Sequence, residues 1–556
     1  MAPIFVGSND DNSRVRSDRV GFAISSSNPG SASEGNAYYN STDNQLNIYD
    51  GSAWSSAGAG GNSVELTASG SISDGQPVIV QTNGKAAGVA TVSIAQTIGS
   101  QVNFQSANGG TDWLSPVYDT ENNKVVIFFQ DTNDSSKGKA VVGTVGGGGT
   151  TISFGTPVIF FNNSASYLSA VYDETQKRTV VFFRSNTGNG RSVVGQVVGT
   201  GITFGSDVQF ESGSTLSTID SVHIKKIDRV GVFYCDHGDS SKGKWCVGKV
   251  NSTNNSISYN QGPNTFSFSS TSITSIAATY DEKLEKVLIL YKQSSSGIYC
   301  RIGNPSDTNT LVMNLADEAQ RIHSGNSSQL QSIYDPDSEK HIVVFEDESS
   351  SQQGSAYVIE ISGGMPEGSF EGKAVYGDKT TFVFGSSVFG RAGISYDTLA
   401  KKVIVVFRNT GTGNDNHGNV IVGTVVGFGI TFNTKEKYSE YNSTEWNSTV
   451  FDPDSQRPVL VAAPNASTPP FARMFRTPFV DTNLTENNFL GFSDAAYSDG
   501  ATAKIQIAGS VDDAQSGLTT ATRLFVQNDG TLSTTAGDPS VFAGTALSAT
   551  KIKVKK

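Results

Sequence analysis

The stretch Val171–Phe183, VYDETQKRTVVFF, decides the fold, because its pattern returns along most of the chain. The pattern is an aromatic residue, an aspartate, four variable residues, a basic residue and then an apolar run. Seven copies lie 51–62 residues apart, and they begin at Tyr118, Tyr172, His223, Tyr280, Tyr334, Tyr396 and Phe451. Seven copies of a β-rich unit of about 55 residues predict a repeat architecture rather than a helical or α/β fold.

Each copy has the chemistry of a β-hairpin. Aspartate follows the first residue in six copies, and Ile224 replaces it in the third. Aspartate favours tight turns because its side chain accepts hydrogen bonds from backbone amides. A basic residue stands five positions later in all seven copies, at Lys124, Arg178, Arg229, Lys286, Lys340, Lys402 and Arg457. The apolar run that follows, such as Val125–Phe129, predicts a strand buried on both faces.

Two more strands are expected in each copy, such as Ala140–Val145 and Ile152–Phe160, which makes four per repeat. An immunoglobulin-like sandwich needs about 100 residues, and a β-helix has a much shorter period. A ring of four-stranded blades leaves only short, protected edges. We therefore predict an all-β fold with a seven-bladed β-propeller over residues 90–480, in which residues 90–104 and 472–479 complete one blade together.

The segments outside the ring predict further β-modules. Residues 1–62 are expected to be an N-terminal β-module followed by a Gly/Ala linker at 57–61. Residues 63–89 and 481–556 are expected to form one small split β-domain, because Ser73-Asp74-Gly75 and Ser498-Asp499-Gly500 each precede a predicted strand. The propeller would then be inserted into this domain, an arrangement that close chain termini make tolerable.

Charge and composition disfavour several classes of function. The 556 residues include 40 Lys and Arg against 52 Asp and Glu, and the net charge of −12 disfavours nucleic-acid binding. No run of 18 apolar residues predicts a membrane span, and Met1–Gly7 lacks the basic and apolar regions of a signal peptide. Three cysteines are too few for a disulfide scaffold. Cys235 and Cys246 flank one hairpin loop, so they are either two buried thiols or a pair.

Several stretches resemble proteins of a known kind. Gly35–Trp54, GNAYYNSTDNQLNIYDGSAW, resembles a module common in structural proteins of tailed bacteriophages, marine ones especially. Leu490–Val554 is similar to the C-terminal ends of phage fibre-like proteins, and repeat motifs such as ISFGTPVIF look like those of phage virion proteins. The resemblance implies a location in the virion, an N-terminal end that anchors to the particle, and a homo-oligomer. It assigns no site residues.

The sequence shows no clear pattern for catalysis or for a metal centre. Sialidase-type Asp boxes are missing, and the repeated aspartates fit turns better than the paired carboxylates of glycoside hydrolysis. Five histidines occur without metal-ligand spacing, and His223 and His341 are interpreted as structural. We therefore predict a non-enzymatic protein with no catalytic residues, no cofactor and no metal site.

Two acidic loops leave a choice open. Asp131 and Asp134 in one loop, and Asp236 and Asp239 in another, are each followed by Ser-Ser-Lys-Gly-Lys. Both loops lack the glutamate of a calcium-binding loop. They are interpreted as solvated turns, with a cation site as the alternative.

Three aromatic residues at one repeat position predict a binding surface. Trp113, Tyr167 and Trp446 each stand five residues before the first residue of a copy, on the face of the ring opposite the Asp turns. Aromatic rings pack against sugar faces, and nearby Ser, Asn and Gly offer adaptable hydrogen bonds. These residues are the predicted glycan-binding site. The alternative is that their rings only cap the core at the rim of the blades.

The sequence is compatible with three candidate functions. The first is a non-enzymatic bacteriophage virion structural protein, a tail fibre, spike or decoration component, whose propeller recognises the host surface. The second is a phage polysaccharide depolymerase or glycosidase with a propeller fold, which the missing catalytic constellation disfavours. The third is a cellular lectin-like adhesin, which the missing signal peptide disfavours. The expected partners are other virion proteins and a host glycan or receptor, with no nucleic acid and no membrane insertion.

Overall fold

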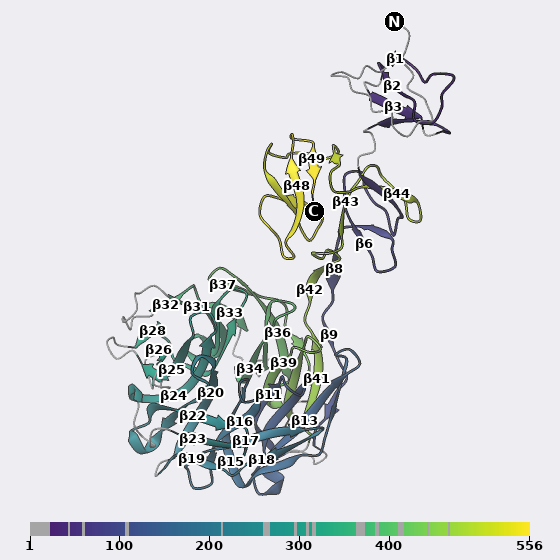
Figure 1. Cartoon of the computed structure of the whole chain (residues 1–556). Helices are drawn as coiled ribbons and strands as arrows, with labels where there is room; N and C mark the ends of the chain where they lie inside the picture. Colours follow the sequence, from purple (N-terminus) through teal and green to yellow (C-terminus); the bar gives the residue numbers. More distant parts are fainter. Residues whose placement is uncertain are drawn as a thin grey trace. The chain divides into compact units, whose positions relative to one another are not determined.

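The computed structural model describes residues 23–42, 45–49, 51–57, 62–105, 110–212, 215–259, 267–293, 297–306, 311–313, 319–362, 373–383, 389–409, 416–441, 444–464 and 468–555. The chain divides into two compact units (Figure 1). The ring unit is Ala95–Phe479, and the flanking unit combines Met1–Ile94 with Val480–Lys556. Within the described residues, no helix is long and apolar enough to cross a membrane. The predictions for Met1–Gly7 and for most of the linker at 57–61 lie outside the described residues.

Within the described residues, the ring unit contains seven hairpin-based antiparallel sheets, sheet 1 to sheet 7 in chain order, and a shared strand makes sheets 1 and 2 continuous, as it does sheets 3 and 4. Their first strands are β11 (Thr111–Asp119), β15 (Val158–Asp173), β20 (Leu216–Ile224), β24 (Ser267–Asp281), β29 (Ser327–Asp335), β34 (Phe389–Asp397) and β39 (Thr444–Asp452). Their second strands are β12 (Lys124–Asp131), β16 (Arg178–Ser185), β21 (Arg229–Asp236), β25 (Lys286–Gln293), β30 (Lys340–Asp347), β35 (Lys402–Asn409) and β40 (Arg457–Pro464). Every second strand begins at the repeated base.

The turn between these two strands is built as the repeat predicts. In sheet 1, Asp119 Oδ1 accepts hydrogen bonds from the backbone N–H groups of Glu121 and Asn122 at 3.0 and 3.1 Å. The same pair of contacts recurs at Asp173, Asp281, Asp335, Asp397 and Asp452. The residue before the base has a positive φ in all seven copies. The predicted hairpin chemistry is therefore confirmed.

The outer part of each sheet differs from the prediction. The third strands are β13 (Lys137–Gly146), β17 (Gly190–Val198), β22 (Lys242–Asn251), β26 (Gly297–Pro305), β31 (Gln353–Ser362), β36 (Gly418–Val426) and β41 (Phe471–Arg476). The predicted fourth strand Ile152–Phe160 is instead two strands, β14 (Thr151–Phe154) and the beginning of β15, which both pair with β13. Gly155 and Pro157 lie at the break, and proline has no N–H for a ladder.

The same division of the outer position recurs in the other sheets. The short outer strands are β18 (Gly201–Phe204), β19 (Val208–Glu211), β23 (Ser256–Tyr259), β27 (Leu311–Met313), β28 (Gln320–His323), β32 (Lys373–Tyr376), β33 (Thr380–Val383), β37 (Gly429–Phe432) and β38 (Glu436–Lys437). Strands β15 and β24 each begin in one sheet and continue as the first strand of the next. These crossings carry the chain directly from sheet to sheet.

The sheets close into a propeller-like ring. Each first strand contacts the first strand of the next sheet, and β39 of sheet 7 contacts β11 of sheet 1. Sheet 7 is completed by β9 (Thr97–Ile98) and β10 (Val102–Asn103), which precede sheet 1 in the chain and pair with β41. The predicted closure by segments from both ends of the repeat array is therefore present.

The hydrophobic core of the ring unit lies between the sheets. Val126 and Phe128 of β12 pack with sheet 2, whereas Val125, Ile127 and Phe129 pack with sheet 7. All five side chains have 0% exposure. Seven such clusters separate the seven neighbouring pairs of sheets. This arrangement explains why the second strand of each copy is a continuous apolar run, since both of its faces are buried.

The flanking unit includes a small N-terminal sheet. Its strands are β1 (Ala23–Ser25), β2 (Ala37–Asn40), β3 (Gln45–Tyr49) and β4 (Trp54–Ala57). Tyr38 is buried, packs edge-on against Trp54 with ring centroids 4.8 Å apart, and donates a hydrogen bond to Asn28 Oδ1 at 2.6 Å. Ile24 and Ile48 remain exposed.

The flanking unit has two further sheets, of which the first combines residues from both sides of the ring unit and the second consists of residues from the C-terminal side alone. One contains β5 (Ser63–Thr67), β44 (Thr502–Gln506), β43 (Phe489–Ser493), β6 (Pro77–Val80) and β7 (Ala86–Gly88), in that order. The other contains β45 (Val511–Asp512), β49 (Ile552–Val554), β48 (Val541–Ala546), β46 (Arg523–Val526) and β47 (Leu532–Ser533). A two-stranded pair joins β8 (Thr91–Ile94) to β42 (Phe479–Thr482). One apolar cluster contains side chains from both larger sheets, among them Ile79, Phe492 and Val541.

Candidate functional site

A β-bulge interrupts the first strand of every sheet of the ring unit. The pairing with the second strand slips between Asp112 and Ser115 in β11, and between Ser166 and Ser169 in β15. Equivalent slips occur in β20, β24, β29, β34 and β39. A bulge redirects the side chains beside it, and bulges are common next to functional sites. Seven bulges at the same level therefore form the framework of the candidate site.

Four bulge residues have a left-handed backbone conformation. The φ angles are 55° at Trp113, 54° at Tyr167, 42° at Thr218 and 55° at Gln329. Such angles are uncommon for residues other than glycine, and they are rarest for bulky and β-branched side chains. Each costs on the order of 1–3 kcal/mol, and residues held this way cluster at ligand-binding and active sites.

The bulges surround a cavity of about 530 Å³. Residues from the first strands of all seven sheets line it, together with Lys292 of β25. A volume in the range of about 300–1,000 Å³ is typical of sites for small ligands. The cavity is lined by Trp113, Leu114, Ser115, Tyr167, Leu168, Ser169, Thr218, Ile219, Asp220, Thr274, Ser275, Ile276, Lys292, Ser328, Gln329, Leu330, Gln331, Ala392, Trp446, Asn447 and Ser448.

The three aromatic residues of the predicted glycan site form one cluster in this cavity. The ring centroid of Trp113 lies 4.1 Å from that of Tyr167 and 4.5 Å from that of Trp446. Trp446 Nε1 donates a hydrogen bond to Asp112 Oδ1 at 2.8 Å, and the Arg184 guanidinium lies 4.5 Å from the Tyr167 centroid. The residues belong to strands rather than to loops. Their rings pack on one another and also form one wall of the cavity.

Asp220 is the acidic residue of the cavity wall. Burial raises the pKa of Asp220 to about 6, against the hydrogen bonds that favour its ionised form. Oδ2 accepts from the Ala278 backbone N–H at 2.7 Å, and Oδ1 accepts from the Ser221 backbone N–H at 2.9 Å and from Ser169 Oγ at 3.2 Å. These contacts join β20 to its neighbours β24 and β15. Asp220 therefore connects three neighbouring first strands.

The cavity wall does not supply the carboxylate pair of a glycosidase. Among the described residues that line the cavity, Asp220 alone carries a carboxylate. Most glycoside hydrolases need two, placed on either side of the bond that is cleaved. The wall instead offers aromatic rings, hydroxyls, amides and the Lys292 ammonium, groups that suit reversible binding of a polyhydroxylated ligand.

In the two acidic loops, lysine side chains occupy the positions between the aspartates at which a bound cation was the alternative. Lys139 Nζ lies 2.8 Å from both Asp131 Oδ2 and Asp134 Oδ2. In the other loop, Lys244 Nζ lies 2.5 Å from Asp236 Oδ2 and 3.3 Å from Asp239 Oδ2. Each loop is a turn of 3-10 helix capped by its first aspartate. An ammonium group of the protein itself neutralises both pairs of carboxylates.

The cysteines are free thiols. Cys235, Cys246 and Cys300 are all buried and form no disulfide. Burial raises the pKa of the Cys235 thiol above its ordinary value. A buried thiol with a raised pKa is a poor nucleophile. These residues belong to the clusters between sheets and not to the cavity.

Sequence reasoning missed most of the cavity wall. Thr218 and Gln329 occupy the same repeat position as the three aromatic residues, so aligning the copies position by position would have found them. Asp220 and Gln331 stand two positions further on, where the other copies carry Ser, Ala or Gly. No repeat signal singles out Lys292, because it lies on a second strand. Sheet 6 carries Arg391 at the repeat position of Trp113, and the side chain of Arg391 lies outside the described part of the structure.

Comparisons with known proteins reveal no sequence family. No family model and no curated protein matches the chain. The solved structures that match the chain include three of the NanB sialidase. They are NanB with Optactamide (10% identity, TM-score 0.38), a point mutant of NanB from Streptococcus pneumoniae (8%, 0.39), and NanB from the same organism in complex with 2-[(3-chlorobenzyl)ammonio]ethanesulfonate (7%, 0.38). Each alignment covers 67% of this chain and 70% of the sialidase chain.

Proposed function

We propose that the ring unit is a seven-bladed β-propeller inserted in a split β-domain, and that the chain is a non-enzymatic structural protein of a bacteriophage virion. In this proposal the propeller presents its central cavity to a glycan on the host surface. The observation that carries the proposal is the cluster of Trp113, Tyr167 and Trp446 on the wall of a cavity framed by seven bulges. The phage assignment rests on the resemblance of the N-terminal and C-terminal stretches to virion proteins.

The physical case for a glycan ligand has two parts. Sugars present apolar C–H faces to aromatic rings and hydroxyl groups to polar side chains. The wall supplies both, since the aromatic cluster lines the same cavity as Asp220, Lys292 and Gln329. The strained backbone at the bulges also holds Trp113 and Tyr167 in place before a ligand arrives, and such preorganisation lowers the entropic cost of binding.

Replacing Trp113, Tyr167 and Trp446 together by alanine is expected to weaken glycan binding at least about 30-fold, because aromatic anchors commonly contribute about 2 kcal/mol or more each. The measurement is binding of the purified full-length chain to a panel of bacterial surface polysaccharides, followed by titration of each polysaccharide that binds. Phe428→Ala is the matched control, since Phe428 is an exposed aromatic residue of the ring unit outside the cavity wall. Thermal unfolding of each variant checks that the ring remains folded.

Unchanged binding by a folded triple variant would refute the site. Turnover of a bound polysaccharide that Asp220→Asn abolishes would replace the proposal by its main competitor, a phage polysaccharide depolymerase. Asp220 is the residue to test because it combines a pKa of about 6 with a place on the cavity wall. Its three hydrogen-bond donors favour a role in joining strands instead.

The N-terminal module is the proposed attachment to the particle. Deleting residues 1–56 is expected to abolish incorporation into virions while leaving the ring unit folded, because β1 to β4 form a sheet of their own with no strand shared with the ring. The measurement is the amount of the chain in purified particles. The triple alanine variant is the control and should be incorporated normally. A deletion variant that still enters particles would move the attachment to another part of the chain. Repeated copies in a homo-oligomer would raise the avidity of weak glycan contacts.

A further inference from the structure

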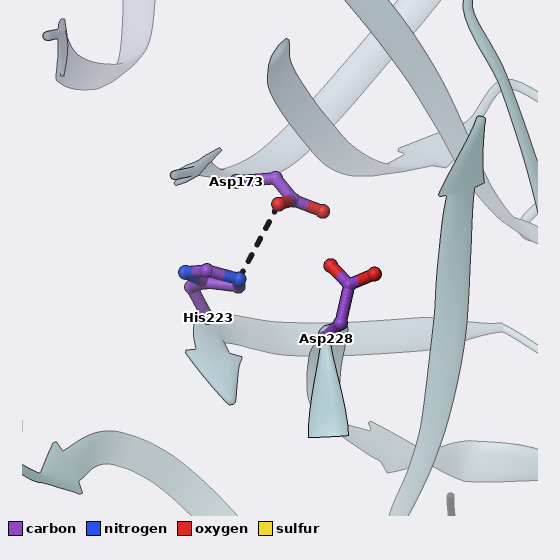
Figure 2. A group of neighbouring side chains, drawn as sticks. All are labelled: Asp173, His223 and Asp228. Carbon is purple, nitrogen blue, oxygen red and sulfur yellow. Dashed lines mark ion pairs between the residues drawn. The ribbon is translucent and has the colours of Figure 1, made fainter. Parts of the chain in front are cut away.

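A cluster of three side chains, Asp173, His223 and Asp228 (Figure 2), lies between sheets 2 and 3, at the end of the first strands opposite to the bulges. Asp173 and His223 are buried, and Asp228 is half-buried. Asp173 ends β15, His223 lies in β20, and Asp228 follows the short 3-10 turn after β20. One carboxylate or imidazole atom from each residue lies within 4.8 Å of the others. His223 Nε2 lies 3.3 Å from Asp173 Oδ1.

Each of the three side chains has a buried polar atom without a hydrogen bond. These atoms are Asp173 Oδ2, Asp228 Oδ1 and both ring nitrogens of His223. Asp173 has 0% exposure and His223 has 6%. A buried polar atom without a partner costs about 1–3 kcal/mol, more for a charged group, and a bound ion is one of the accepted explanations. The three residues therefore present unused donor atoms to the same small volume.

Four of the five other repeat aspartates have a hydrogen-bond partner at Oδ2, whereas Asp173 has none. Oδ2 of the equivalent aspartates accepts a hydrogen bond from Asn122 Nδ2 at Asp119, from His341 Nε2 at Asp281, from Ser338 Oγ at Asp335 and from Ser455 Oγ at Asp452. Oδ1 of Asp173 makes the usual turn contacts, whereas Oδ2 has no such partner. Asp173 therefore makes the usual turn contacts through Oδ1, while its Oδ2 is available to bind a ligand.

Histidine also replaces the usual aromatic residue at this place. The repeat tyrosine of a sheet reaches the Asp turn of the sheet before it, as Tyr172 OH does in accepting from the Glu121 backbone N–H at 3.3 Å. In sheet 3 the tyrosine position is His223, which brings an imidazole to the turn of Asp173. Asp228 occupies the left-handed position before the base, where the other copies have Asn, Lys, Glu or Gln. His223 and Asp228 each differ from the residues of the other copies, and each adds a metal-binding side chain beside the turn of Asp173.

Charge favours a cation there. Among the described residues, neither Asp173 nor Asp228 forms an ion pair with a lysine or arginine, unlike the aspartates of the two acidic loops. The two neighbouring carboxylates therefore have no lysine or arginine among the described residues to neutralise them. A divalent ion would neutralise the two carboxylates.

We propose that Asp173, His223 and Asp228 bind one divalent transition-metal ion of the Zn²⁺ type, which joins the turns of sheets 2 and 3. Two carboxylate oxygens and one imidazole nitrogen are ligands that Zn²⁺ accepts in tetrahedral sites, with water in the remaining position. Gln176 orients one ligand, because its Nε2 donates to Asp228 Oδ2 at 3.1 Å. The ion would be structural, since the site lies at the opposite end of the first strands from the cavity.

The test is zinc binding by the full-length chain after EDTA treatment and dialysis, measured by equilibrium dialysis with ZnCl₂ and by elemental analysis. We expect one Zn²⁺ per chain. His223→Tyr should remove it, and this variant restores the residue that most copies carry, so the fold is preserved. Asp173→Asn and Asp228→Asn should each weaken binding more than about 100-fold, because loss of a supporting residue alone costs about 10–100-fold.

His341→Gln is the matched control, since His341 is another buried histidine that contacts a turn aspartate, at 3.2 Å from Asp281 Oδ2. It should keep the zinc stoichiometry. Zn²⁺ should raise the unfolding temperature of the wild-type chain and of His341→Gln, but not that of His223→Tyr. No uptake by the wild-type chain, or equal uptake by His223→Tyr, would overturn the proposal. Both results are independent of glycan binding.

Discussion

Phe182→Ala is expected to lower the free energy of unfolding of the ring unit by about 3–5 kcal/mol. Phe182 has 0% exposure and lies in the cluster between sheets 2 and 3, with its ring centroid 5.7 Å from that of Phe210. Alanine at this position removes most of a large side chain from a packed interface and leaves a cavity. Because the neighbouring side chains belong to two hydrogen-bonded sheets, they have little freedom to fill it.

The measurement is chemical and thermal unfolding of the full-length chain, followed through the transition of the ring unit. Val198→Ala is the control from the same sheet, since Val198 is 58% exposed and its truncation should change stability by less than about 0.5 kcal/mol. An equal, small effect of both substitutions would show that the cluster between the sheets is not the core of the ring.

Gly205→Ala is expected to destabilise the ring unit by about 3 kcal/mol, at the upper end of the usual cost of overpacking. A Cβ at Gly205 would collide with the backbone carbonyl oxygen of Asn255, in the outer turn of the next sheet. A carbonyl of the backbone moves only if the turn moves, so a side-chain rotation does not relieve the collision. Gly155 and Gly377 meet the carbonyls of Thr200 and Phe428 in the same way.

The matched control is Gly201→Ala, four residues earlier in the same outer segment. A Cβ at Gly201 would have the Val198 carbonyl oxygen at 3.7 Å as its nearest neighbour, an ordinary contact. The two variants add the same methyl group to the same sheet, so the difference in unfolding temperature reports the contact between sheets. If both variants have the unfolding temperature of the wild-type chain, the close approach of neighbouring sheets does not require glycine at position 205.

The parts of the fold that were predictable are those with local causes. In six of the seven copies the turn depends on an aspartate and on backbone amides two and three residues away, so its chemistry is visible within a few residues of sequence. The second strand was predictable because burial on both faces leaves no polar position in Val125–Phe129. The division of the outer strand was not predicted, because it depends on contacts with the next sheet. One of these contacts is the close approach of Gly155 to the backbone carbonyl of Thr200.

The candidate site was predictable only where an unusual residue occupied a repeat position. Trp113, Tyr167 and Trp446 stand out as aromatic residues in a polar context, and the structure brings them together. The left-handed backbone at Trp113 and Tyr167 carries no sequence signal, because neither residue type favours it. The Asp173–His223–Asp228 cluster was also invisible, since its members come from two copies of the repeat and show no metal-ligand spacing along the chain.

The closure of sheet 7 has a consequence for the order in which the chain is made. Strands β9 and β10 leave the ribosome first, whereas their partner β41 follows about 370 residues later. At about 5–20 residues per second, translation of that interval takes roughly 20–70 s. Throughout this time Val125, Ile127 and Phe129 of sheet 1 lack the covering residues Val459, Val461 and Met474. The nascent ring therefore keeps one apolar face open until its last sheet is synthesised, and a chain that stops short of Arg476 never covers it.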